Sequence, residues 1–355
     1  MKTRSKRDGM FRMFRFPKGS RWIFLHAKAL SVCLLVSAQP LAFGQVPLII
    51  DTDMATDCDD AGALAVAHAL ESRGECRILA VVVNNKDPYS VGAVDAINTW
   101  YGRGDVPLGA YQGDTVGKTG SYKTIAENTS AYGHDVVTRK QVPDAITTYR
   151  TVLAAQPDSS VVIASIGWLN NLGDLLKSPG DAISPLTGRE LVAAKVKSAS
   201  IMGGRYPAGS EYNFTSFGSP PSTQYVIANW PDSVPLMFQG YEIGENVSTG
   251  PSLLATPAEN PVRHAYETIY NGIKGRHSWD QCTILHAVHG LGGYWTAVTA
   301  GSNTINPDGT NSWVTAPDKN HAYSVVSMPK PKLAAVIADL MDDPPRKPAP
   351  GLKSK

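Results

Sequence analysis

Five aspartates fall within ten residues near the start of the chain: Asp51, Asp53, Asp57, Asp59 and Asp60. They follow directly on an apolar run, 46–50, so they are expected where a buried strand ends. Carboxylates this close repel one another unless a cation lies among them. Oxygen ligands without histidine favour calcium or magnesium over zinc, and the density of carboxylates favours calcium. The segment therefore predicts a calcium site at a strand end.

Three other structures could contain such an acidic segment. An EF-hand loop beginning at Asp57 is excluded, because His68 would stand at its twelfth position, where a carboxylate ligand is needed. A phosphatase that forms an aspartyl-phosphate also begins with a strand and Asp-x-Asp, but it has no role for the Asp59-Asp60 pair. An exposed acidic helix start explains that pair through the helix dipole but not the two earlier aspartates. These last two alternatives stay open, although only the metal site uses the whole cluster.

The segments around the cluster alternate between strand-like and helix-like patterns. Strands are expected at the Val- and Ile-rich runs 46–50, 78–83, 161–166 and 196–202. Helices are expected at 60–71, 90–101, 145–155, 222–229, 262–273 and 279–289. Continuous apolar strands are what a parallel sheet covered on both faces requires. We therefore expect an α/β fold with an open, mostly parallel, doubly wound sheet flanked by helices, in which ligands bind at the carboxyl ends of the strands.

Polar motifs recur after the expected strands in a recognisable order. After Asp51-Thr52-Asp53 and Asp59-Asp60-Ala61 come Val83-Asn84, Gly167-Trp168-Leu169-Asn170-Asn171-Leu172, Met202-Gly203-Gly204, Glu211-Tyr212-Asn213-Phe214 and Ser278-Trp279-Asp280. Each later motif is weak alone, but their joint order over roughly 46–330 resembles the inosine-uridine-preferring nucleoside hydrolases. The chain looks like an exported bacterial member of that family, and the resemblance implies a nucleoside hydrolase-like fold.

The resemblance also implies the metal ligands. Calcium would be bound by the side chains of Asp53, Asp60 and Asp280 and by the backbone carbonyl of Asn170. Asp51 matches the family's first aspartate and is expected to orient the ligands rather than to touch the metal. The chain departs from the shortest family pattern by two extra residues after Asp53, by Trp168 in place of proline and by asparagine at 170 in place of threonine. A backbone ligand tolerates a change of side chain.

The resemblance also implies which residues bind the sugar. The residues expected to bind the ribose are Asp59, Asn84, Glu211 and Asn213. Carboxylates and amides suit a diol, because each hydroxyl both donates and accepts a hydrogen bond. The implied activity is calcium-dependent hydrolysis of the N-glycosidic bond of ribonucleosides by a metal-bound water, with Asp53 as the general base.

The leaving group is where the chain departs most from the family. Better-known members have a histidine directly before the late aspartate, and this chain has Trp279 there. An indole cannot donate a proton at neutral pH, but it can stack on a purine, which predicts faster cleavage of purine than of pyrimidine nucleosides. His277, two residues earlier, is either the acid that protonates the base or a surface residue.

Residues 1–44 differ in composition from the rest. They hold nine Lys or Arg against one acidic residue, then a short apolar run at 29–36 and small residues at Ala42 and Gly44. This layout is typical of a secretory signal peptide, and the apolar run is too short for a stable membrane span, which takes about 20 residues. We expect a periplasmic or secreted protein whose mature chain begins near Gln45. A mis-assigned start codon is the alternative.

The remaining chain, 45–340, is expected to be one catalytic domain, followed by a flexible, Pro-rich tail at 341–355. The whole chain carries +2 and the leader 9 − 1 = +8, so the mature part carries 2 − 8 = −6, which argues against nucleic acid as a partner. Cys58, Cys76 and Cys282 are too few and odd in number for a disulfide framework.

The expected partner is a small molecule, a nucleoside or a related N-riboside. A secreted nucleoside- or ribose-binding protein could use the same residues without turnover, and product release would separate the two functions. A structural protein that kept only the metal would leave Glu211 and Asn213 without a role. A homo-oligomer is compatible with the sequence, which does not specify the preferred base.

Overall fold

A mostly parallel sheet runs through the protein. The computed structural model describes residues 44–269, 273–317 and 319–345. Within them the main sheet has the strand order β10-β13-β7-β5-β4-β1-β2-β3, and every pairing is parallel except β10 with β13. Its strands are β1 (Val46–Thr52), β2 (Cys76–Val83), β3 (Leu108–Ala110), β4 (Val161–Ile166), β5 (Val196–Met202), β7 (Leu236–Gln239), β10 (Trp295–Val298) and β13 (His321–Val326). The predicted architecture is confirmed.

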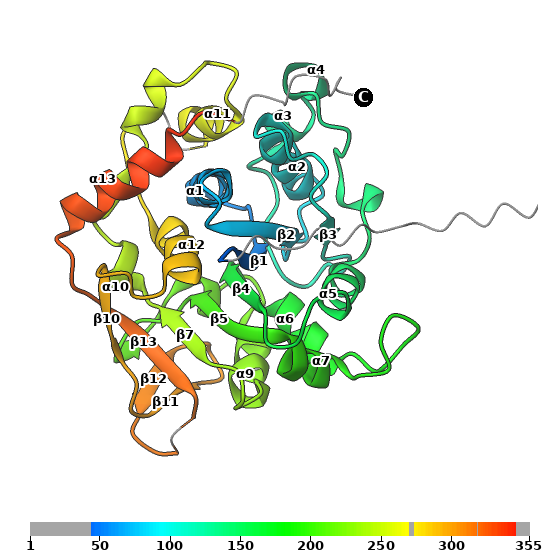
Figure 1. Cartoon of the computed structure of the whole chain (residues 1–355), viewed down its shortest axis with the longest axis vertical. Helices are drawn as coiled ribbons and strands as arrows, with labels where there is room; N and C mark the ends of the chain where they lie inside the picture. Colours follow the sequence, from blue (N-terminus) through cyan, green and yellow to red (C-terminus); the bar gives the residue numbers. More distant parts are fainter. Residues whose placement is uncertain (1–43, 270–272, 318, 346–355) are drawn as a thin grey trace, which may run out of the picture. The chain divides into compact units, whose positions relative to one another are not determined.

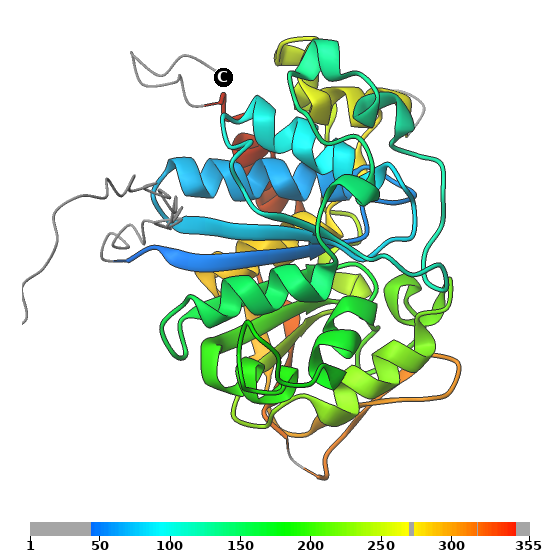
Figure 2. The same ribbon diagram turned by 90° about the vertical axis from the view of Figure 1, so that its right-hand side faces the viewer.

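Helices cover both faces of this sheet (Figure 1). On one face lie α1 (Asp59–Ser72), α2 (Ser90–Trp100), α11 (Pro261–Thr268), α12 (Trp279–His289) and α13 (Lys330–Met341). On the other lie α5 (Ala145–Ala154), α6 (Asn170–Lys177), α7 (Gly188–Lys195) and α9 (Pro220–Asn229). Figure 2 shows α1 and α2, in blue and cyan, on one side of the strands and the green helices α5, α6 and α7 on the other. Each face therefore has its own hydrophobic core.

The strand β1 shows why the apolar runs are continuous. Leu48 and Ile50 pack into the core under α1, and Ile49, between them, packs into the core on the opposite face. Successive side chains of a strand point to opposite faces, so a strand buried on both needs apolar residues throughout. All three side chains are fully buried. The pattern that predicted a parallel sheet thus has its physical cause in this double burial.

Short elements complete the fold. A three-stranded sheet is formed by β6 (Ala208–Gly209), β11 (Ser302–Ile305) and β12 (Asn311–Val314), and a two-stranded one by β8 (Ser248–Thr249) and β9 (Arg276–His277). The short helices are α3 (Lys123–Ala126), α4 (Thr129–Tyr132), α8 (Tyr212–Thr215), α10 (Tyr241–Gly244) and the 3-10 turns η1 (Arg139–Gln141) and η2 (Pro251–Ala255). Several of these lie near the carboxyl ends of the main strands and carry residues of the candidate site.

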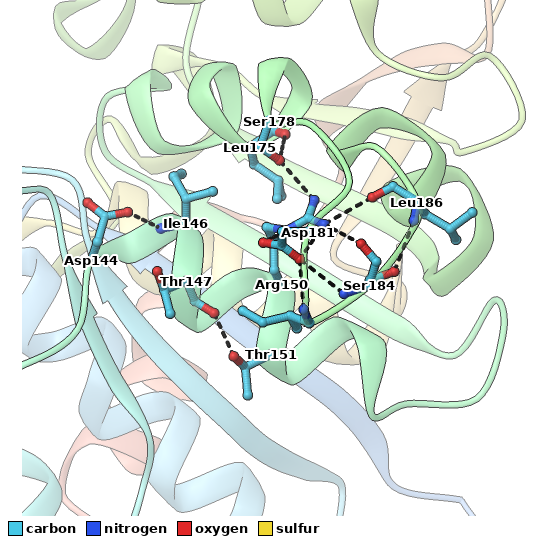
Figure 3. Close-up of polar contacts among 11 residues, drawn as sticks. Asp144, Ile146, Thr147, Arg150, Thr151, Leu175, Ser178, Asp181, Ser184 and Leu186 are labelled. Carbon is cyan, nitrogen blue, oxygen red and sulfur yellow. Dashed lines mark hydrogen bonds and ion pairs between the residues drawn. The ribbon is translucent and has the colours of Figure 1, made fainter.

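A buried arginine fastens α5 to the loop before α7 (Figure 3). The guanidinium of Arg150 pairs with Asp181, at 2.8 Å from Nε to Oδ2 and 3.0 Å from Nη2 to Oδ1. It also donates to Ser178 Oγ at 3.0 Å and to the carbonyls of Ser184 and Leu186 at 2.9 and 3.0 Å. Its side chain is 2% exposed. This positive charge is buried at little cost because the fold itself supplies its partners.

The predicted ends of the chain lie largely outside the described residues. The expected leader is described only at Gly44 and the expected tail only over 341–345, where Asp343 pairs with Arg73 at 2.7 Å. The described cysteines, Cys58, Cys76 and Cys282, are all buried and free. In the part of the chain that the structure describes, no helix combines the length and the apolar character needed to cross a bilayer.

Candidate active site

Strand ends and helix starts meet at one cavity of about 320 Å³. Asp53 follows β1, Ile166 ends β4 and Met202 ends β5, and all three line the cavity. The first turns of α1 and α12 lie there too and bring Asp59 and Trp279 to its wall, each with the aspartate that follows it. The cavity thus lies where open α/β sheets bind their ligands.

Acidic side chains dominate the wall of this cavity. They are Asp53, Asp57, Asp59, Asp60, Glu211 and Asp280. All of them except Asp57 are buried, and they come from segments far apart in the sequence. The structure therefore brings together most of the site residues predicted from the sequence. Asn213 and Trp279 complete that group in the lining.

Burial and mutual repulsion make these carboxylates hard to ionise. Burial is the first cause of the raised pKa of Asp53, Asp59 and Asp280, and the neighbouring aspartates raise all three further. The pKa of Asp60 rises to about 7, again mainly through burial, although Thr52 Oγ1 and the Met54 N–H, at 3.1 Å, donate to it and act in the opposite direction. A positive partner would reverse these shifts.

The donor set fits a hard divalent cation, although no metal cluster is assembled. Nowhere in residues 44–269, 273–317 and 319–345 do three His, Cys, Asp or Glu side chains stand close enough together to grip an ion as they are. The wall nevertheless offers carboxylate oxygens and no imidazole or thiolate. Oxygen donors of this kind are the ligands of calcium and magnesium. A bound cation would offset the burial and the mutual repulsion that raise the pKa values of these acids.

Asp51 lies behind the wall in a hydrogen-bonded layer. Tyr149 OH donates to its Oδ2 at 2.7 Å, and Asn84 and Asn171 donate to its Oδ1 at 2.7 and 3.3 Å. Burial nevertheless raises the pKa of Asp51 to about 7. Asp51 is absent from the lining, which agrees with a residue that orients its neighbours rather than one that touches a ligand.

Two predicted site residues, Asn84 and Asn170, belong to this layer and not to the lining. Asn170 Nδ2 donates to the carbonyl of Asn84 at 3.0 Å. Among the described residues, Oδ1 of Asn84, Asn170 and Asn171 has no hydrogen-bond partner. Gly167, directly after β4, lies close to this layer, because a Cβ there would lie 2.8 Å from Nδ2 of Asn84. The layer therefore holds buried acceptors directly behind the acidic wall.

Glu211 and Asn213 form another part of the wall. Glu211 caps α8 and accepts from the N–H groups of Asn213 at 2.9 Å and Gly204 at 3.2 Å. Burial raises the pKa of Glu211 to about 7 despite these bonds. Asn213 Nδ2 donates to the Met202 carbonyl at 3.3 Å. The sequence motif is thus a real structural unit, in which a helix cap fixes one carboxylate and one amide at the cavity.

Trp279 lies in the lining, and His277 does not. The indole N–H of Trp279 donates to the carbonyl of Tyr241 at 2.6 Å, and the two rings lie 5.1 Å apart. His277 Nδ1 accepts from the backbone N–H of Asn246 at 2.9 Å. Burial, and then the charge of Arg276, lower the pKa of His277. The imidazole is thus anchored outside the cavity.

Arg276 is the main feature that the sequence analysis missed. It lines the cavity, pairs with Asp57 and approaches Asp59 with 3.7 Å between Nε and Oδ1. Its guanidinium carbon lies 4.8 Å from the centre of the Trp279 ring. Three residues before a tryptophan, an arginine in a short edge strand carries no sequence pattern of its own. It lies in β9, which pairs with β8, and it meets the acidic segment after β1 through Asp57 and Asp59.

Comparisons with known proteins identify the fold. No family model matches the sequence, and no curated protein sequence matches it. Solved structures do match. An inosine-guanosine nucleoside hydrolase superposes with a TM-score of 0.62 at 15% identity, over 84% of this chain and 99% of that one. The inosine-uridine preferring nucleoside hydrolase from Bacillus anthracis gives 0.62 at 14% identity, over 84% and 99%.

A third match is the type III effector protein XopQ, solved in complex with adenosine diphosphate ribose. Its TM-score is 0.61 at 15% identity, over 85% of this chain and 93% of that chain. The chain therefore has the fold of the nucleoside hydrolases, as the motif order predicted. At these identities the likeness establishes the fold, and the function must be argued from the cavity.

Proposed function

We propose that the protein hydrolyses the N-glycosidic bond of ribonucleosides or closely related N-ribosides, with Ca²⁺ as its cofactor. The observation that carries the proposal is one cavity of about 320 Å³ whose wall combines buried aspartates with Glu211, which caps α8, and Asn213. Its volume falls in the range of roughly 300–1,000 Å³ of small-molecule sites. Two structural neighbours are nucleoside hydrolases, which supports the same class of reaction.

The acidic wall is where the cation would be held. The residues proposed to hold it are Asp53, Asp60 and Asp280, with the backbone carbonyl of Asn170 added from the family resemblance. When bound, Ca²⁺ would neutralise these groups, hold ribose hydroxyls and acidify a water molecule. The fit rests on the oxygen-only donors and on the raised pKa values of the three aspartates.

Asp53 is the proposed general base. Its pKa is raised by burial and by Asp60, and a positive charge beside it would lower that pKa and favour the carboxylate form that a general base needs. With the wall neutralised, its carboxylate can take the proton of the attacking water as the oxygen bonds to the anomeric carbon. Cation binding therefore determines whether Asp53 can act as the general base.

Asp59, Glu211 and Asn213 are the proposed sugar-binding residues in the lining. Ring flattening in the transition state changes the positions of the ribose hydroxyls, so rigid partners favour the flattened form. Glu211 is made rigid by the backbone N–H groups that it caps. Asn84 stays a proposed sugar ligand, although it lies behind the wall and its amide already donates to Asp51.

The decisive experiment is incubation of the protein with a nucleoside panel and calcium, with free base and reducing sugar as the readouts. We expect catalytic turnover, faster on inosine than on uridine, and its loss on chelation. Binding without product would instead identify a nucleoside- or ribose-binding protein. Neither binding nor turnover with any N-riboside would overturn the proposal.

We also propose that the protein is exported. The composition of residues 1–44, with nine basic residues, a short apolar run and small residues before Gln45, supports this. The intact mass of protein recovered from the periplasm or medium should correspond to a chain beginning near Gln45. Recovery of the full chain with Met1 from those fractions would contradict it.

A further inference from the structure

Neither Trp279 nor His277 is placed to donate a proton to the leaving group at neutral pH. Trp279 occupies the position of the family's histidine, and its only N–H is already bonded to the Tyr241 carbonyl. His277 lies outside the lining, its Nδ1 accepts from Asn246, and its pKa is lowered by burial and by Arg276. Departure of the base must therefore be assisted in another way than by either of these residues.

Arg276 is the cation of this part of the wall. Its side chain is 16% exposed, it lines the cavity, and its guanidinium lies over the Trp279 ring at 4.8 Å. The ion pair with Asp57 and the proximity of Asp59 fix its direction. A guanidinium has five N–H donors in one plane, so it can hold a carboxylate on one edge and meet an acceptor with another.

We propose that Arg276 is a catalytic residue that stabilises the departing base as an anion. This inference rests on the proposed function and names the group that replaces the general acid. As the bond between the anomeric carbon and the base nitrogen breaks, its electron pair passes to the base, where Arg276 N–H groups donate to the nitrogen or oxygen that gains charge. The water oxygen bonds to the anomeric carbon and its proton passes to Asp53. The released base takes a proton from solvent, and Asp53 returns its own proton to solvent, which balances the reaction.

A donor aimed at a developing charge in a partly buried site has a large effect. Removing one such donor from other enzymes lowers turnover by about 10²- to 10³-fold. Asp57 and Asp59 hold the guanidinium before the reaction, so no reorganisation is needed as the charge appears. The same two carboxylates also offer a competing explanation, in which Arg276 only neutralises the acidic wall.

The test compares two leaving groups in the same enzyme. Inosine needs help with its departing base, whereas 4-nitrophenyl β-D-riboside releases a phenolate that is stable without protonation. Arg276→Gln should lower kcat on inosine by about 100-fold and kcat on the nitrophenyl riboside by less than about 3-fold. The matched control is Arg205→Gln, because Arg205 lies over the Tyr241 ring at 4.2 Å but outside the lining, and it should leave the ratio of the two rates unchanged.

The outcomes separate the two explanations. Equal loss on both substrates in Arg276→Gln would assign Arg276 a structural or neutralising role and overturn the proposal. Failure of the wild-type enzyme on both ribosides would overturn the proposed function as well. If Arg276→Gln does not fold, Arg276→Lys keeps the charge without the planar donors and should still lose more on inosine than on the nitrophenyl riboside. Equal losses of kcat on the two substrates in Arg276→Lys would also overturn the proposal.

Discussion

Two regions of the protein bury charge in opposite ways. Around Arg150 the fold supplies every type of partner that a guanidinium needs: a carboxylate from Asp181, a hydroxyl and two carbonyls (Figure 3). The result is a pKa of Asp181 lowered to about 2, first through its hydrogen bond with Arg150. This region is complete without a ligand, so its role is to stabilise the packing of α5 against the loop before α7.

The acidic wall is the incomplete counterpart. Asp53, Asp60 and Asp280 have raised pKa values, and the cation described in their cavity, Arg276, pairs with Asp57 instead. Buried carboxylates that a fold leaves without enough positive charge are costly to stability. Where a protein keeps such a cluster in a cavity, the difference from a matched ion pair indicates a site for an external ligand.

The largest effect is expected from Asp53→Asn. The substitution removes a proposed metal ligand and the general base at once, so nucleoside turnover should fall by about 10³-fold or more, which corresponds to about 4 kcal/mol of transition-state stabilisation. The matched control is Asp105→Asn, an exposed carboxylate paired with Arg103, and its rate should equal that of the wild type. A similar loss in both variants would show that the wall is not the catalytic region.

A substitution in the region around Arg150 should lower the stability of the protein without lowering its activity. Arg150→Met removes the hydrogen bonds to Asp181 and to the carbonyls of Ser184 and Leu186, and leaving a buried acceptor such as the Ser184 carbonyl unpaired costs about 1–3 kcal/mol. For a domain of this size we expect Tm to fall by roughly 2–5 °C in calorimetry. Activity per folded molecule should be unchanged below the transition. A selective loss of kcat with Tm unaffected would contradict the contrast drawn between the regions.

Calcium bound at the acidic wall should stabilise the protein. A ligand that binds only the native state stabilises it by about 2.7 kcal/mol at 100 times its Kd. Chelation should therefore lower Tm by roughly 4 °C, and Asp60→Asn should abolish most of that response. The Arg150→Met variant serves as the control, because its Tm should still rise with calcium. An equal Tm with calcium and with chelator, and no metal by elemental analysis, would remove calcium from the proposal.

The sequence predicted the buried strands and helices better than the short or partly buried strands. The strands at 161–166 and 196–202 and the helix at 279–289 have the predicted bounds, because apolar periodicity reports burial directly. β7, β10 and β13 were not predicted, since these strands are short or only partly buried and lack a continuous Val and Ile run. The helix predicted over 262–273 has its described end at Thr268.

In the candidate site, too, some residues were predicted from the sequence and others were not. Asp53, Asp59, Asp60, Glu211 and Asp280 were found from local motifs, each next to a strand end or helix start, and they line one cavity. Arg276 was missed, because it meets the acidic segment through contacts with Asp57 and Asp59, which are more than 200 positions earlier in the chain. Residue type alone also could not separate the lining from the layer behind it. Asn84 and Asn213 are both amides near strand ends, yet one faces Asp51 and the other the cavity.

The pH dependence of stability should differ in sign between the regions. Asp181 has a pKa lowered from 3.8 to about 2, so its contribution is present above pH 4 and is lost as the pH falls toward 2. Glu211 has a pKa raised from 4.5 to about 7, so the native state is favoured below pH 4.5 and loses stability as the pH rises to about 7. In chelator, Asp181→Asn should flatten the acid limb of Tm against pH, and Glu211→Gln should reduce the slope between about pH 5 and 7. Unchanged slopes in both variants would show that neither group governs its limb.

The smallest effect is expected at the border of the incomplete region. His277 lies beside Trp279, with 5.0 Å between the ring centres, but outside the cavity lining. Its Nδ1 is occupied as an acceptor by the Asn246 N–H, and its pKa is lowered, so at neutral pH the ring is mainly uncharged. His277→Gln keeps a polar side chain of similar reach and should change kcat on inosine by less than about 2-fold, which is under about 0.5 kcal/mol. A loss of about 100-fold on inosine, with the rate on 4-nitrophenyl riboside preserved, would instead identify His277 as the acid that protonates the base. His277 would then belong to the active site, and the role of Arg276 would be to neutralise the acidic wall.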